Sequence, residues 1–215
     1  MMTMRRVRWA PLLLGAAAVA GALLLGVLVG RGGTALDEAV ARSLGRWCDT
    51  RECLTVADAL ATEGGWPYAV YATAALPLPV AGAVLLTGRG QPGRRARALA
   101  RRLLVVLLVL VAAQVLLSQL YGRVGPDATA SDPATAYPSG AALLVAFAWI
   151  GSGMVVVALR PEWRGTWWPL TACVLLVHGV VRVTVSKHWA TDIIGSYVLV
   201  SGALTIAAAG LYRPP

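Results

Sequence analysis

Long apolar runs, separated by short polar connectors, limit what this 215-residue chain can fold into more than any other feature. A run of about 20 apolar residues is long enough to cross the hydrocarbon core of a bilayer as a helix. In that core every backbone N–H and C=O group needs a partner within the protein, which favours helices over loops and open sheets. We therefore predict an all-α, polytopic membrane protein. Residues 1–215 form one domain with six spans, at about 9–30, 67–86, 103–120, 139–159, 167–185 and 190–211.

Charged residues make up 13% of the sequence, about half of their usual share in a soluble domain. Six spans place both termini on one side, where twelve basic residues stand against one acidic residue. The opposite side has seven basic and nine acidic residues. Because positively charged connectors stay in the cytoplasm, we predict a multi-pass protein of the cell membrane with both termini cytoplasmic. The basic connector 88–102 is then expected to be a solvated loop near anionic lipid headgroups, and not a nucleic-acid site.

The N-terminal third leaves two alternatives open. The first apolar run follows three arginines, as a signal peptide would, but it exceeds the usual length of about 7–15 residues, which favours an uncleaved span. Residues 31–66 form the longest polar segment, and their spacing of apolar positions indicates a short amphipathic helix on the membrane surface. Cys48 and Cys53 fall in this segment. Outside the cytoplasm they either form a disulfide or remain two free thiols.

The segment from Arg182 to Asp192 holds the residues best suited to chemistry. It contains His188, one of only two histidines in the chain, at the outer junction of the last two predicted spans. An aspartate four residues after a histidine shares a helix face with it. A carboxylate beside an imidazole fixes its tautomer and raises its basicity, while an arginine offers a planar fork for phosphate oxygens. The spacing predicts a phosphoryl-transfer site on the extracytoplasmic side.

A second external loop is expected to reach the same place. It ends in the sequence Tyr-Pro-Ser-Gly-Ala, residues 137–141, where the fourth predicted span begins. Ser139 is a favourable N-cap residue, and Gly140 permits a close approach to the backbone. Unpaired N–H groups at a helix N-terminus are a natural seat for a phosphate. We therefore predict that Ser139 and Gly140 bind the phosphate of the substrate.

Both segments resemble motifs of the type 2 phosphatidic acid phosphatase (PAP2) family of membrane lipid phosphatases, whose three motifs read KxxxxxxRP, PSGH and SRxxxxxHxxxD. The third motif is matched by Arg182, His188 and Asp192, and the second by residues 138–140. The resemblance implies a six-helix PAP2-like bundle in which His188 is the nucleophile and forms a phosphohistidine. It also implies that Asp192 orients this histidine and that Arg182 binds phosphate with Ser139.

The sequence departs from the family's pattern at four positions that bear on catalysis. These are Ala141 in place of the proton-donating histidine, Val181 in place of the serine, and Ser118 and Gly125 in place of the lysine and arginine of the first motif. Three nearby residues could take over the roles of the missing histidine, lysine and arginine. Arg123 lies in the same loop as the missing arginine and could reach the phosphate. His178 is either an auxiliary acid or an interior histidine bonded to a neighbouring helix, and Lys187 contacts either the phosphate or lipid headgroups.

The expected activity is that of a metal-independent phosphatase or phosphotransferase, without cofactors, acting on a lipid or polyprenyl (di)phosphate at the extracytoplasmic leaflet. Losing a general acid typically costs a factor of about 10²–10⁴ in rate, which matters less when the leaving group is itself a phosphate. The alternative is a catalytically impaired protein on the same scaffold, which binds a phosphorylated lipid or serves an assembly role. No nucleic-acid partner is expected, and the sequence does not identify protein partners.

Overall fold

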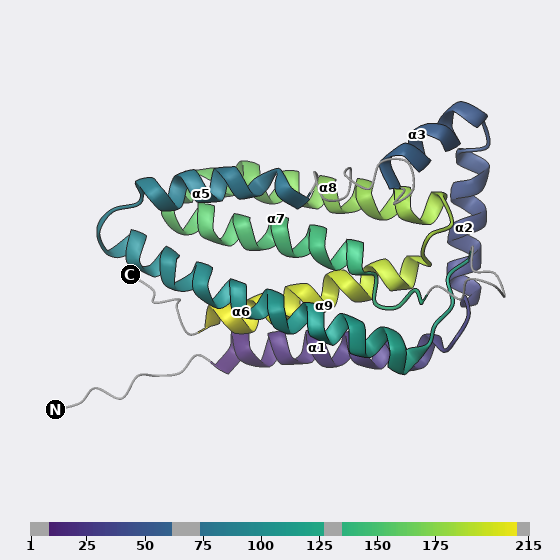
Figure 1. Ribbon diagram of the computed structural model, residues 1–215, viewed down its shortest axis with the longest axis horizontal. Helices are drawn as coiled ribbons and strands as arrows, with labels where there is room; N and C mark the ends of the chain where they lie inside the picture. The colour runs from purple at the N-terminus through teal and green to yellow at the C-terminus, as the bar shows by residue number, and fades with distance from the viewer. Residues whose placement is uncertain (1–8, 62–73, 127–134, 210–215) are drawn as a thin grey trace.

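The computed structural model describes residues 9–61, 74–126 and 135–209, and almost all of their regular structure is helical (Figure 1). An isolated bridge between Val124 and Thr135 is the one extended pairing in these ranges. The helices are α1 Trp9–Val29, α2 Ala35–Trp47, α3 Arg51–Ala61, α5 Pro77–Thr87, α6 Gly90–Tyr121, α7 Gly140–Leu159, the short 3₁₀ helix η1 Pro161–Trp163, α8 Arg164–Thr184 and α9 Ala190–Ala209.

Within the described residues, five helical stretches are long and apolar enough to cross a membrane, which confirms the all-α, multi-pass architecture. They are Trp9–Val29, Gly93–Tyr121, Gly140–Leu159, Pro161–Thr184 and Ala190–Ala209. The remaining predicted span, at 67–86, begins outside the described residues. Its described part is mainly the eleven-residue helix α5, which starts at Pro77, directly after a turn. The count of six spans therefore stays a prediction.

Helix α7 lies at the centre of the bundle, between α5, α6, α8 and α9 (Figure 1). Its small and apolar side chains are buried along most of its length, and residues such as Leu143 and Val156 belong to the main hydrophobic core. Helix α1 packs along α9 on one side of the bundle. A Cβ atom on Gly202 would lie 2.8 Å from the Gly15 carbonyl oxygen, so glycine is needed for this close approach.

The predicted amphipathic helix is present as α2, which crosses one end of the bundle (Figure 1). Thr34 and Asp37 form a capping box at its start, because the Thr34 side chain accepts from the Asp37 N–H while the Asp37 carboxylate accepts from the Thr34 N–H. Such reciprocal caps satisfy two backbone donors that the helix itself cannot satisfy. Asp37 is completely buried, which a residue on a solvent-facing helix would not be.

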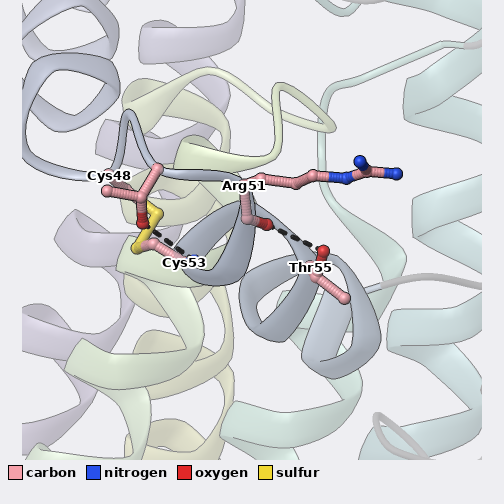
Figure 2. Close-up of a disulfide and its surroundings, with 5 residues drawn as sticks. Cys48, Arg51, Cys53 and Thr55 are labelled. Carbon is pink, nitrogen blue, oxygen red and sulfur yellow. Dashed lines mark hydrogen bonds between the residues drawn. A yellow bond between two sulfur atoms is a disulfide. The ribbon is translucent and has the colours of Figure 1, made fainter.

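The two cysteines of this segment form a disulfide at the corner between α2 and α3 (Figure 2). Cys48 follows the last residue of α2, and Cys53 lies in the first turn of α3. The Thr55 hydroxyl donates to the Arg51 carbonyl in the next turn, and the Arg51 side chain extends away from the disulfide (Figure 2). The open question between a disulfide and two free thiols is thus answered in favour of the disulfide.

The prediction of a loop for the basic connector 88–102 was wrong, because α6 begins at Gly90 and includes the arginine-rich stretch. Arginine and alanine are good helix formers, and after Gly93 the stretch holds no glycine or proline that would break a helix. The arginine side chains are exposed, so the charge of the stretch stays at the surface. Arg102 also donates to the Ala207 carbonyl near the end of α9, at 3.2 Å.

Candidate functional site

The predicted site residues meet at the end of the bundle that α2 crosses (Figure 1). Here α7 and α9 begin, and α6 and α8 end. The loop between α6 and α7 is drawn together by a bond from the Ala136 N–H to the Arg123 carbonyl, at 2.7 Å. The Trp189 indole donates to the Val124 carbonyl, at 2.9 Å, and so fixes the α8–α9 connection against this loop. The first and last motifs of the sequence are therefore neighbours in space.

His188 is almost completely buried, and both of its ring nitrogens have partners. Nδ1 lies 3.1 Å from the Ala136 carbonyl oxygen, and Nε2 lies 3.1 Å from the Ser139 hydroxyl. A carbonyl oxygen accepts but cannot donate, so Nδ1 carries the proton. Nε2 then holds a lone pair, which accepts the Ser139 hydroxyl proton. This is the tautomer that a nucleophilic Nε2 requires.

Ser139 connects this lone pair to the N-terminus of α7. It is the N-cap residue of α7, and its hydroxyl oxygen accepts from the Ala142 N–H at 3.3 Å. Its own N–H donates to the Ser196 hydroxyl at 2.9 Å, and Ser196 donates in turn to the Asp192 carbonyl. Gly140 follows as the first residue of α7. The positive end of the α7 helix dipole is thus adjacent to Nε2 of His188.

Asp192 does not orient His188 in the way the sequence predicts. Its Oδ2 atom lies 3.9 Å from Nδ1, which is longer than a hydrogen bond. Oδ2 instead accepts from the Trp189 N–H at 2.9 Å and caps α9, while Oδ1 lies 3.1 Å from Nη1 of Arg123. The backbone carbonyl of Ala136 fixes the tautomer in place of the carboxylate. Sequence reasoning missed Ala136 because a backbone acceptor leaves no signal in residue type.

Arg123 contacts Asp192, the carboxylate that lies nearest to Nδ1 of His188. Its Nη2 atom is 2.7 Å from Asp37 and its Nη1 atom is 2.9 Å from the Thr191 hydroxyl, and all of its side chain is buried. The expected role as a phosphate ligand would require Arg123 to leave two carboxylates. Asp37, which sequence reasoning read as part of a surface helix, is therefore a site residue. The Thr34-x-x-Asp37 capping signature marks this position without revealing its buried partners.

The other three predicted site residues surround His188 at different depths. Arg182 is buried in the last turn of α8, and Lys187 is half-buried beside the histidine. His178 lies one turn deeper, where its Nδ1 is 2.9 Å from the Tyr197 hydroxyl of α9. Because Tyr197 donates to the Leu175 carbonyl, it accepts the Nδ1 proton of His178. The structure therefore shows His178 as an interior histidine bonded to a neighbouring helix.

Electrostatics keep the His188 imidazole neutral. Burial lowers its pKa to about 3, together with the positive charges of Arg182 and Lys187, although the bond to Ala136 acts in the opposite direction. Burial also acts on Asp37 and would raise the pKa of its carboxyl group. Hydrogen bonds from Thr191 and Thr34 outweigh that effect and hold this pKa below its ordinary value. The site thus combines a neutral imidazole with an ionised Asp37 carboxylate.

The positions that depart from the motifs offer no substitute charge. The Ser118 hydroxyl donates to the Val115 carbonyl of its own helix at 2.9 Å, Gly125 is buried, and Ala141 packs beside apolar residues of α7. In the described parts of the chain, no three His, Cys, Asp or Glu side chains gather as ligands for a metal ion. The groups of the site that are suited to phosphate chemistry are His188, Ser139 and the nearby cations.

Comparison with known proteins yields a likeness in structure only. No protein-family model matches the sequence, and no curated protein matches it. The fold is similar to the crystal structure of the first transmembrane PAP2 type phosphatidylglycerolphosphate phosphatase from Bacillus subtilis, with a TM-score of 0.61. The two chains are 17% identical over 91% of this chain and 94% of that one. This similarity confirms the predicted PAP2-like fold, and at this level of identity it speaks for the fold alone.

Proposed function

We propose that this chain is a PAP2-like membrane phosphatase or phosphotransferase that acts on a lipid or polyprenyl (di)phosphate at the extracytoplasmic leaflet. The observation that carries the proposal is the placement of Nε2 of His188 at the N-terminus of α7, where the bond from Nδ1 to Ala136 leaves Nε2 unprotonated. A neutral imidazole is a nucleophile, and a helix N-terminus favours the negative charge of a phosphate. The proposal treats residues 1–215 as one membrane domain with both termini cytoplasmic.

In the proposed reaction the substrate phosphate replaces Nε2 as the partner of the Ser139 hydroxyl. Nε2 attacks phosphorus, the bond to the leaving oxygen breaks, and a phosphohistidine forms. The Nδ1 proton stays on the ring, where the Ala136 carbonyl accepts its hydrogen bond as positive charge develops. Arg182 lies close enough to affect the pKa of His188, and we assign it to the phosphate oxygens. Water then attacks the phosphohistidine, releases phosphate and regenerates the neutral imidazole.

The absence of a histidine at Ala141 narrows the choice of substrate. An alkoxide leaving group needs a proton, and losing the residue that supplies it costs a factor of about 10²–10⁴ in rate. A phosphate leaving group is stable without that proton. We therefore propose that diphosphates react faster than monoesters. Phosphatidylglycerolphosphate, on which the structural neighbour acts, belongs in the test panel as the monoester with a lipid headgroup.

The test uses the purified full-length protein and measures phosphate release from a panel of lipid and polyprenyl mono- and diphosphates. His188→Ala should abolish release, and wild type incubated with ³²P-labelled substrate should carry an acid-labile label. Glu38→Ala is the matched control, because Glu38 is exposed on α2 and pairs with the exposed side chain of Arg42 on the same helix. The mechanism is wrong if His188→Ala keeps the wild-type rate.

A second function has one observation in its favour. Arg123 is paired with Asp37 and Asp192, and the first-motif positions Ser118 and Gly125 carry no cation, so the site offers fewer free positive charges than the complete motifs would supply. On this alternative the protein binds phosphorylated lipid without turning it over. Restoring the family's pattern with Ala141→His, Ser118→Lys and Gly125→Arg separates the two functions. An inert wild type and an active restored variant would establish the binding role.

A further inference from the structure

We infer that Arg123, anchored by Asp37, is a positioning residue of this site: it holds the Asp192 carboxylate away from His188, so that the Ala136 carbonyl holds the imidazole. Its importance for catalysis rests on the proposed function, whereas the geometric claim can be tested without turnover. The sequence alone suggested that Arg123 binds phosphate, and it suggested no role in the site for Asp37.

Arg123 bridges two buried carboxylates that come from distant parts of the chain. Its Nη2 atom lies 2.7 Å from Asp37 in α2, and its Nη1 atom lies 3.1 Å from Oδ1 of Asp192 in α9. All three side chains have no exposed surface. Breaking a buried ion pair of this kind is strongly destabilising, because removing one partner leaves an uncompensated buried charge. Arg123 therefore holds Oδ1 of Asp192, while the Trp189 N–H holds Oδ2 at 2.9 Å.

Asp37 keeps Arg123 in place and is itself held from several sides. Its Oδ2 atom accepts from the Thr34 N–H and hydroxyl at 3.0 and 2.9 Å. The Thr191 N–H donates to Oδ1 and the Thr191 hydroxyl donates to Oδ2, each at 2.9 Å. Thr191 directly precedes Asp192, so Asp37 joins α2 to the first turn of α9. Helix α2 thus helps to set the position of the α8–α9 connection, which carries His188.

Two acceptors compete for the single proton on Nδ1 of His188. The Ala136 carbonyl has it at 3.1 Å, and Oδ2 of Asp192 stands 3.9 Å away. The difference is small enough that a modest rotation of Asp192 would bring a carboxylate into hydrogen-bond range. Arg123 prevents this rotation by holding Oδ1. A carboxylate bonded to Nδ1 would make the imidazole more basic, whereas a neutral carbonyl leaves it weakly basic.

Several other charged or titratable groups face His188, and none of them replaces the control by Arg123. They are Arg182 and His178 of α8, Lys187 in the α8–α9 connection, and Asp192 of α9. Tyr197 of α9 contacts His178, Tyr137 in the loop before α7 interacts with Asp192, and Asp37 of α2 pairs with Arg123. The cations among them disfavour protonation of His188. Asp192 is the acidic group of this set closest to the ring, so its orientation decides how readily His188 takes up a proton.

The experiment follows the two histidines of the chain by ¹⁵N NMR in detergent, with His188→Gln used to assign the signals. Wild type should keep His188 neutral, with the proton on Nδ1, down to a pH of about 5. Arg123→Gln should raise the His188 pKa by about one to three units, as expected for a carboxylate that comes into contact. Arg123→Lys should restore most of the wild-type value. Arg102→Gln, at the opposite end of the bundle, is the control and should cause no shift.

Because Arg123→Gln alone leaves two buried carboxylates, the double variant Asp37→Asn/Arg123→Gln provides a version that is neutral at this pair. It frees Asp192 in the same way and should show the same rise in the His188 pKa. An unchanged titration of His188 in both Arg123 variants would overturn the inference. Asp37→Asn alone removes the anchor but leaves the Arg123 guanidinium beside Asp192, so it should raise the His188 pKa less than the double variant does. A rise as large as that of the double variant would also contradict the inference.

The two proposals fail in different ways. If wild type releases no phosphate but Arg123→Gln raises the His188 pKa, the proposed function fails and the positioning role stands. If phosphate release depends on His188 but its pKa is the same with and without Arg123, the positioning role fails and the function stands. Where both hold, the acid limb of kcat/KM against pH should move to higher pH in Arg123→Gln and return towards wild type in Arg123→Lys.

Discussion

Replacing Asp37 with alanine should be among the most destabilising single changes at the end of the bundle that holds His188. The substitution removes the buried partner of Arg123 and the acceptor of four hydrogen bonds from Thr34 and Thr191. It also destroys the capping box at the start of α2. Arg123 would remain buried with Asp192 as its carboxylate partner, and the Thr191 N–H would lose its acceptor.

The magnitude follows from these contacts. Breaking a buried ion pair by removing one partner costs about 3–5 kcal/mol. At about 2–4 °C per kcal/mol for a chain of this size, the melting temperature should fall by about 6–20 °C. Glu38→Ala, one position further along α2, breaks a pair with Arg42 whose side chains are both more than half exposed. Exposed pairs contribute about 0–1 kcal/mol, so this control should melt close to wild type.

The assay is thermal unfolding of purified protein in detergent, followed by tryptophan fluorescence, for wild type and both variants. A double-mutant cycle with Asp37→Asn and Arg123→Gln measures the coupling between the two side chains directly. If the two side chains form a buried pair, the loss of unfolding free energy in the double variant should be smaller than the sum of the losses in the two single variants. We expect a difference of more than about 1 kcal/mol, which is the order of couplings between contacting residues. Equal melting temperatures for Asp37→Ala and Glu38→Ala would refute the assignment of Asp37 to the site.

Three further predictions concern the frame of the site. Cys48→Ser/Cys53→Ser removes a cross-link between residues only five apart, so the free energy of unfolding should fall by about 2 kcal/mol. The melting temperature under non-reducing conditions measures this loss. Gly195→Ala would place a Cβ atom 2.5 Å from the Tyr137 ring, and this overpacking should lower the free energy of unfolding by about 1–3 kcal/mol. A melting temperature equal to that of wild type would exclude the contact. Because the pKa of His188 is about 3 in the folded protein and about 6.5 when unfolded, the unfolded state binds the proton more tightly below a pH of about 6.5. Stability should therefore fall on acidification through that window by up to about 1.4 kcal/mol per pH unit, and His188→Gln should reduce this slope in melting curves recorded across pH.

The sequence was sufficient for the architecture because apolar runs of membrane length have few alternative structures. It failed at the connector 88–102, where a glycine- and arginine-rich composition indicated a loop although the residues after Gly93 favour a helix. The spacing of Arg182, His188 and Asp192 was enough to place these residues at one end of the bundle, because that spacing is local.

The arrangement behind the histidine could not be predicted in the same way. Asp37 meets Thr191 across 154 residues of sequence, and nothing in the local pattern around either residue indicates the contact. The Ala136 carbonyl is a backbone group, so its role has no residue-type signature. The orientation of the Arg123 side chain depends on which carboxylates the fold buries beside its guanidinium group. Each of these features arises from tertiary packing of segments that local periodicity treats separately.

The most direct test of the central claim is phosphate release by purified wild-type protein and by His188→Ala, on a panel of lipid and polyprenyl phosphates. Because an unprotonated Nε2 of a neutral His188 imidazole lies at the N-terminus of α7, we expect wild type to release phosphate and to carry an acid-labile ³²P label. His188→Ala should lose both the phosphate release and the label. Phosphate release that continues at the wild-type rate without His188 would contradict the account, as would a label that is stable in acid.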